Sequence, residues 1–222
     1  MAAVVVAIIV AIVAYELTSS GSSKTSKAQP HQPAVNFSAN GAKVYGTLGP
    51  ENVPLELGAP LAAPNTGLTG KPIDGVQCNV GEQLAYHHHV HVAIFINGQP
   101  RSVPIAVGMV PPAQVEKTPQ GDFAESASCF YWLHVHAQDG IVHIESPIAK
   151  TYELGQVFDI WHQPLSSTQL GPYTGKVTTT VNGAPWTGNP AQIPLNEHTQ
   201  IVLNLGGPVV APPLISWSGT GL

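Results

Sequence analysis

Histidine is concentrated in one part of this chain, where it recurs with the spacing of a β-strand. Seven of the ten histidines lie within residues 87–143. Side chains two positions apart lie on the same face of a strand, so His89 and His91 form one pair of imidazoles and His134 and His136 a second. Neutral imidazole is the commonest ligand for transition metals in proteins. The pattern therefore predicts two neighbouring strands whose histidines converge on a metal ion.

The predicted ion is copper or zinc. Two pairs of imidazoles supply three or four nitrogens without a thiolate, and this donor set suits Cu(II) or Zn(II). One further histidine, which follows a predicted turn, is expected to join them. The predicted ligands are His89, His91, His134, His136 and His143. The side chains expected to lie beside these ligands and support them are His87, Glu145 and Asp139.

Hydrophobic periodicity predicts a mainly β fold. In residues 89–96, Val and Ile alternate with His, Ala and Phe, which gives one apolar face and one face that begins with imidazoles. An Asn-Gly pair at 97–98 predicts a hairpin, and Asp139 with Gly140 predicts a second turn. The predicted strands lie at residues 89–96, 129–136, 141–145, 177–181 and 200–205.

One short helix interrupts this pattern. Leu154, Val157, Phe158 and Trp161 fall at positions i, i+3, i+4 and i+7, which predicts an amphipathic helix with its apolar face on a sheet. The expected fold class is mainly β, an antiparallel sheet or sandwich-like arrangement, with this α-helix and an N-terminal transmembrane or packing helix.

Composition divides the chain into four predicted parts. The 21 prolines and 22 glycines favour long irregular connections around one domain. A strand ending in Asn-Gly, with Pro two positions later, occurs at residues 92–100 and again at 177–185, which indicates two similar hairpins. The parts are an N-terminal membrane anchor at 1–17, a flexible or extended linker with a possible short strand at 18–75, a His-rich β domain at 76–205, and a Pro-rich tail at 206–222.

The N-terminal segment is strongly apolar. Residues 2–15 contain no polar side chain other than Tyr15, and with Leu17 the stretch approaches the roughly 20 residues that span a bilayer. It has no basic residues before it and no clear cleavage site after it, which favours an uncleaved anchor over a signal peptide. A buried core helix or a packing helix is the alternative.

The two cysteines, Cys78 and Cys129, each precede one histidine cluster. In exported proteins an even number of cysteines most often pairs, so we expect a disulfide and a location on the extracytoplasmic side, in the periplasm or at the cell surface. Cys129 and His134 also have a spacing found in blue-copper sites. No Met follows them, however, and a disulfide would remove the thiolate that such a site needs.

Charge excludes one class of partner. The formal net charge is -5, and only eight residues are Lys or Arg. A protein that neutralises phosphates needs a basic stripe, so nucleic acid is not an expected partner.

Several stretches together resemble a family of uncharacterised exported, membrane-anchored archaeal and bacterial proteins with His-x-His and LHxHxxxGxxHIESP-like motifs. The second motif is matched by residues 133–147, and the resemblance extends over residues 76–217. It implies an exported protein with a single folded domain, and it brings no activity with it.

Three functions fit this sequence. The first is a membrane-anchored extracytoplasmic protein that binds copper or zinc and serves in metal storage, delivery or sensing. The second is a metal-dependent enzyme, with Glu145 or Asp139 as general base. The third is an accessory or structural subunit, docked by its N-terminal helix to a larger membrane complex or assembled into a homo-oligomer or surface filament.

Overall fold

The computed structural model describes residues 43–211 and 214–222. The predicted anchor at 1–17 and the first part of the predicted linker lie outside these residues. Within the described part of the chain, no helix combines the length and the apolar character needed to cross a bilayer.

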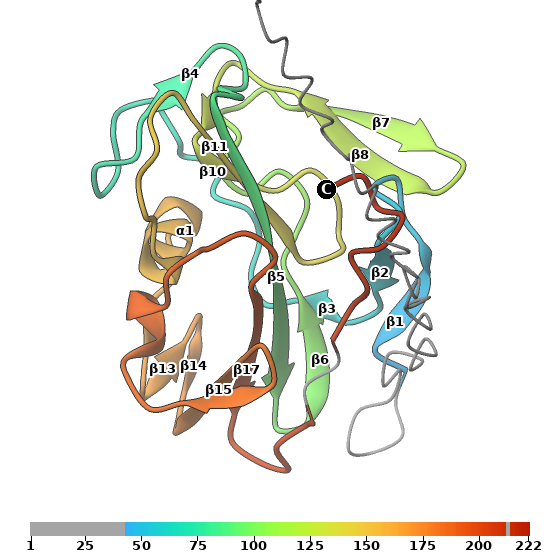
Figure 1. Cartoon of the computed structure of the whole chain (residues 1–222), viewed down its shortest axis with the longest axis vertical. Coiled ribbons are helices and arrows are strands. Elements are labelled where there is room, and N and C mark those ends of the chain that lie inside the picture. The colour runs from blue at the N-terminus through green and yellow to red at the C-terminus, as the bar shows by residue number, and fades with distance from the viewer. Residues whose placement is uncertain (1–42, 212–213) are drawn as a thin grey trace, which may run out of the picture. The chain divides into compact units, whose positions relative to one another are not determined.

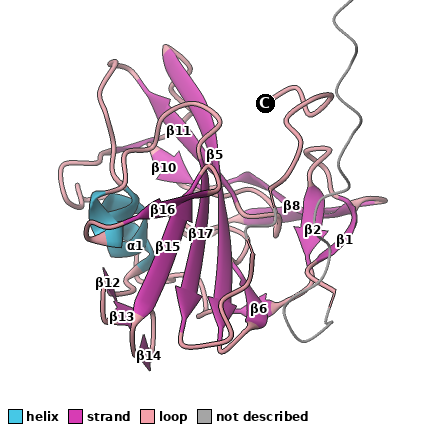
Figure 2. Cartoon of the chain, turned by 60° about the horizontal axis from the view of Figure 1, so that its bottom comes forward, coloured by secondary structure: helices cyan, strands magenta, loops and turns pink. Residues whose placement is uncertain are grey.

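A central sheet of eight strands organises the described residues (Figures 1 and 2). Its longest strand, β5, pairs antiparallel with β11 through its first half and parallel with β17 through its second half. The predicted β-rich fold with one short helix is confirmed, but the sheet is mixed rather than purely antiparallel. Its strands are β3 (Ala59–Pro60), β5 (Tyr86–Ile96), β6 (Gln99–Ser102), β10 (Leu133–His134), β11 (Ile141–Ser146), β15 (Val177–Val181), β16 (Ala184–Trp186) and β17 (Gln200–Leu205).

Smaller sheets and two helices surround it. The α-helix α1 spans Leu154–Trp161, as predicted, and a 3-10 helix, η1, spans Pro190–Gln192. The remaining strands are β1 (Tyr45–Leu48) with β2 (Pro54–Glu56), β4 (Cys78–Asn79) with β9 (Phe130–Tyr131), β7 (Gln114–Thr118) with β8 (Gly121–Ser126), and β12 (Leu165–Ser166), β13 (Gln169–Leu170) and β14 (Tyr173–Thr174).

Both faces of the central sheet are covered (Figure 1). On one face, Val90 and Val92 of β5 belong to the main core with the apolar side of α1, as the helical period predicts. On the other face, Ala93 and Phe95 pack with residues of β1 and of the C-terminal segment. The imidazoles near the start of β5 lie on this second face, because alternate residues of a strand share a face.

Both predicted Asn-Gly hairpins are present. Asn97 and Asn182 have φ of 50°, in the left-handed region that the two central residues of a tight hairpin turn require. The first turn joins β5 to β6, and the second joins β15 to β16. Both lie in the same sheet, where β17 separates β15 from β5.

The folded region begins before residue 76, within the segment predicted to be a linker. Val44 and Val53 are fully buried, and β3 pairs with β6 of the central sheet. The Pro-rich segment after residue 205 contains no strand among its described residues, yet it is packed. The Gln200 side chain accepts a hydrogen bond from the Ile215 N–H and donates one to the Ile215 carbonyl. This pair of bonds fixes the segment against β17.

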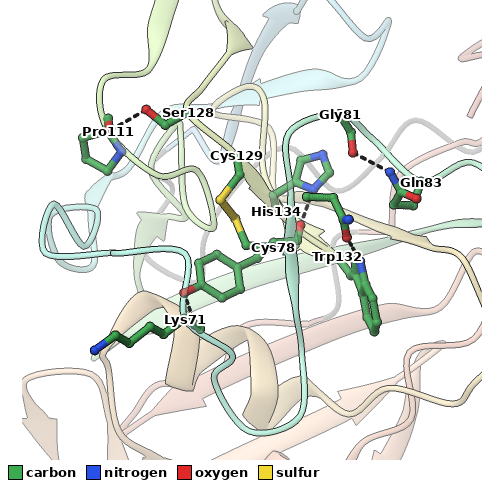
Figure 3. Close-up of a disulfide and its surroundings, with 11 residues drawn as sticks. Lys71, Cys78, Gly81, Gln83, Pro111, Ser128, Cys129, Trp132 and His134 are labelled. Atoms are coloured by element: carbon green, nitrogen blue, oxygen red, sulfur yellow. Dashed lines mark hydrogen bonds between the residues drawn. A yellow bond between two sulfur atoms is a disulfide. The ribbon is translucent and has the colours of Figure 1, made fainter.

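The predicted disulfide is present (Figure 3). It joins Cys78 in β4 to Cys129 just before β9, across 51 positions of sequence. The Trp132 indole N–H donates to the Asn79 side chain at 2.7 Å, which holds the same two segments together. Figure 3 shows the bridge close to Trp132 and His134. The disulfide therefore fixes the segment from which one of the candidate histidines projects.

Removing the disulfide with Cys78→Ser and Cys129→Ser together is expected to lower the free energy of unfolding by roughly 2 to 4 kcal/mol, because the bridge restricts the unfolded chain. Urea unfolding of the oxidised protein and of the double variant measures this difference. Reduced wild-type protein is the control and should unfold like the variant. An unchanged midpoint in both would contradict the prediction.

Candidate metal site

Three histidines from three adjacent strands form one row across the central sheet. The register of β10 with β11 places His134 opposite His143, and the register of β11 with β5 places His143 opposite His89. Side chains opposite one another in an antiparallel pair lie on the same face. Figure 2 shows the three strands next to one another. The convergence of imidazoles from separate stretches of chain is thus a consequence of strand register.

Four side chains could hold one ion. His134, His136, His143 and Glu145 each offer a ligand atom, and these atoms all lie within 4.8 Å of one another. All four side chains are buried, and His134 is fully inaccessible. Glu145 follows His143 by two positions in β11, so both project from the same face.

Backbone carbonyls fix the orientation of two of these rings. Nδ1 of His134 donates to the carbonyl of Tyr131 at 2.8 Å, and Nδ1 of His136 donates to the carbonyl of Ala124 at 2.6 Å. A carbonyl only accepts, so each Nδ1 carries the hydrogen of its ring. This leaves Nε2 of both rings as the lone-pair nitrogen, in the arrangement usual for metal-binding histidine.

The two lone-pair nitrogens face each other. Nε2 of His134 lies 3.0 Å from Nε2 of His136. Burial and the neighbouring histidines lower the pKa of His134 well below its usual range, and burial and His143 lower that of His136 to about 4. Both rings are therefore neutral near pH 7, and neither Nε2 carries a hydrogen. Two such acceptors repel at this distance unless a cation lies between them.

His143 is held by two carboxylates. Its Nε2 lies 2.8 Å from Oε1 of Glu51, and its Nδ1 lies 3.3 Å from Oε1 of Glu145. Burial alone would lower the pKa of His143, but the hydrogen bonds to Glu145 and Glu51 outweigh it and raise the pKa to about 10. Glu51 fixes Nε2 as a donor, so Nδ1 is the nitrogen that can bind an ion, and the ion would displace the proton that this pKa leaves on Nδ1 near pH 7.

A second group lies beside the first and shares His143. His87, His89 and His143 also have ligand atoms within 4.8 Å of one another. Nε2 of His87 lies 3.1 Å from Oε1 of Glu145. The predicted supporting residues His87 and Glu145 are therefore both within reach of an ion and belong to the candidate ligands themselves.

The site opens into a surface depression of about 390 Å³. Phe123 of β8 lines it and stacks on His136, with ring centres 4.8 Å apart. Glu82 also lines it, and its Oε1 lies 3.4 Å from Nε2 of His136. Burial and the charge of Glu145 raise the pKa of Glu82. An ion bound here would be reachable from solvent and would lie close to an additional carboxylate.

The structure does not bring every predicted residue into this site. His91 belongs to neither group of candidate ligands. It lies further along β5, where its ring approaches that of Tyr45 with centres 6.0 Å apart. Asp139 is a turn residue, as its position before Gly140 predicts, and its Oδ1 accepts a hydrogen bond from Ile141 N–H at 3.1 Å. It is buried and interacts with Glu51, so its connection with the site is indirect.

Sequence analysis missed two acidic residues of the site. Glu51 lies in the segment predicted to be a flexible or extended linker, and nothing in its neighbourhood predicts burial. Glu82 follows Cys78 by four positions, so the predicted disulfide was a signal that this loop lies near the second histidine cluster. Neither position has a periodic pattern that could reveal its contacts.

The chain matches no protein family model, and no curated protein or solved structure is similar to it. The resemblance to exported, membrane-anchored proteins therefore stays a prediction. The chemistry of the site is inferred from the contacts of its own side chains.

His91 should make the stability of the metal-free protein depend on pH. Burial lowers its pKa from 6.5 to about 4. Below pH 6.5 the unfolded chain takes up a proton that the folded protein excludes, so stability falls with pH down to about 4. The contribution approaches 1.4 kcal/mol per pH unit.

This contribution is measured by urea unfolding of metal-free protein at several pH values between 7 and 4, for wild type and His91→Gln. The variant should lose less stability than wild type as the pH falls. Parallel curves for the two proteins would show that His91 is not the group responsible.

Proposed function

We propose that this protein binds copper or zinc through His134, His136, His143 and Glu145. The observation that supports it best is the pair of neutral imidazoles whose lone-pair nitrogens face each other at 3.0 Å. Oε2 of Glu145, buried and without a hydrogen-bond partner, lies 3.8 Å from one of them. These acceptors are already desolvated and oriented, which is the arrangement that a cation stabilises.

The donor set limits the choice of metal. Both cysteines are in the disulfide, so no thiolate is available and a blue-copper site has no sulfur ligand. Imidazoles with one carboxylate oxygen form many Zn(II) sites, and imidazole nitrogen is also a preferred donor for Cu(II). The absence of thiolate also argues against selectivity for Cu(I).

The proposed role is metal handling on the extracytoplasmic side of a membrane, with residues 1–17 as anchor. The disulfide supports this location, because such bridges persist mainly in oxidising compartments. The depression above the site supports storage or delivery, since an ion could enter and leave without unfolding. Docking to a larger complex or a filament stays a prediction from the sequence.

Elemental analysis of natively purified protein tests the proposal. We expect stoichiometric copper or zinc in wild type and its loss in the double variant His134→Ala, His136→Ala, because that variant lacks both facing nitrogens. The matched control is His88→Ala. It removes an imidazole from the same histidine cluster, but one that stacks on Tyr86 and approaches Glu197 instead of the site.

The control should keep its metal. Protein that folds normally but binds neither Cu(II) nor Zn(II) in equilibrium dialysis would refute the proposed function. Circular dichroism of each variant distinguishes lost binding from lost folding.

A metal-dependent enzyme is the second candidate. The opening beside Glu82 favours it, because a metal ion at the site could activate water and a carboxylate could accept the proton. Binding of azide to Co(II)-substituted protein distinguishes the two functions. A change in the visible spectrum would indicate an exchangeable coordination position, as an enzyme needs, whereas an unchanged spectrum would indicate a closed storage site.

A further inference from the structure

The Glu145 carboxylate lies between the two groups of histidines. Its Oε1 is 3.1 Å from Nε2 of His87 and 3.3 Å from Nδ1 of His143. Its Oε2 is 3.8 Å from Nε2 of His134. The two oxygens of one carboxylate therefore face different imidazoles, which is the position of a bridging ligand.

We propose that the site binds two metal ions at once, bridged by the carboxylate of Glu145. This inference rests on the proposed function, adds a second ion to it, and assigns His143, which belongs to both groups of candidate ligands, to the second ion when both are bound. The inner ion is bound by His134, His136 and Oε2 of Glu145. The outer ion is bound by His87, His89, Nδ1 of His143 and Oε1 of the same carboxylate.

Unpartnered buried atoms support a second ion. Nε2 of His89 is inaccessible to solvent and has no hydrogen-bond partner. Nδ1 of His143 is equally buried and faces Oε1 of Glu145 at 3.3 Å. Leaving a buried polar atom without a partner costs about 1 to 3 kcal/mol. A single ion at His134 and His136 leaves Nε2 of His89 without an ion to coordinate. An outer ion accounts for it.

The charge around the site fits two divalent ions. Glu51 contacts His143, Glu145 lies between the groups, and Glu82 and Glu125 line the depression. These four carboxylates would balance the four positive charges of two divalent cations. None of the described residues that line the depression is Lys or Arg.

The two positions differ in access. The His87 side chain is 37% exposed, whereas that of His134 is 0% exposed. The outer position therefore adjoins solvent, and the inner one lies deeper, where His136 but not His134 lines the depression. We expect the inner ion to bind first and more tightly, and the outer ion to exchange more readily.

Titration of the metal-free full chain with Zn(II), followed by isothermal calorimetry and elemental analysis after dialysis, tests the inference. The expected result is two ions per chain with two affinities. His87→Ala with His89→Ala should reduce the number to one, and His88→Ala, the matched control, should keep two. His87→Ala alone, at the more exposed position, should weaken only the second binding step and is the safeguard against misfolding of the double variant.

A bridge predicts a further signature. With two Cu(II) ions bound, magnetic coupling through the carboxylate should diminish the electron paramagnetic resonance signal per copper, and Glu145→Gln should restore it. One ion per wild-type chain would overturn the two-ion site and leave the proposed function standing. No bound ion would overturn both, and two ions retained by the His87→Ala, His89→Ala variant would overturn the assignment of the outer ligands.

Discussion

The pairing of β11 between β10 and β5 is the constraint on which the candidate site depends. Because side chains alternate between the two faces of a strand, a slip of one residue in either register would move His143 and Glu145 to the face occupied by the main core. The apolar neighbours of these residues prevent this slip. Val142 and Ile144 are fully buried in the core on the opposite face, so the hydrophobic pattern of β11 fixes its histidine and glutamate in place.

Burial of both sheet faces gives the site its chemical character. Imidazoles on an open sheet would titrate in water, whereas here the chain covers the histidine face with the segment that carries Glu51 and the hairpin of β7 and β8. Desolvation keeps His134 and His136 neutral, and two carboxylates make His143 the exception. Rings in one row of one sheet therefore differ widely in proton affinity, and the cause is their immediate hydrogen-bond partners.

Local patterns were sufficient to predict the elements that carry the site. The period of two in β5, the Asn-Gly turns and the helical spacing of α1 all express short-range rules, and each prediction is confirmed. The disulfide was predicted instead from the even number of cysteines, and it too is present. The same patterns could not show that His89 reaches the site whereas His91 lies beside the core residue Tyr45, because the two histidines are equivalent in spacing. They also could not show that Glu51 reaches His143 across 92 positions of sequence, since irregular segments carry no periodic signal of their tertiary contacts. The second ligand type, a carboxylate, was predicted only as a neighbour of the imidazoles.

The contact between Glu51 and His143 has a thermodynamic consequence. A site assembled from such distant residues is complete only in the native fold, whereas the run His87, His88 and His89 is local and keeps its three imidazoles close together even in a denatured chain. Metal would then bind the native protein tightly and the denatured chain more weakly. Because binding to the denatured chain offsets part of the stabilisation, the metal should raise the melting temperature by less than its affinity for the native protein alone implies.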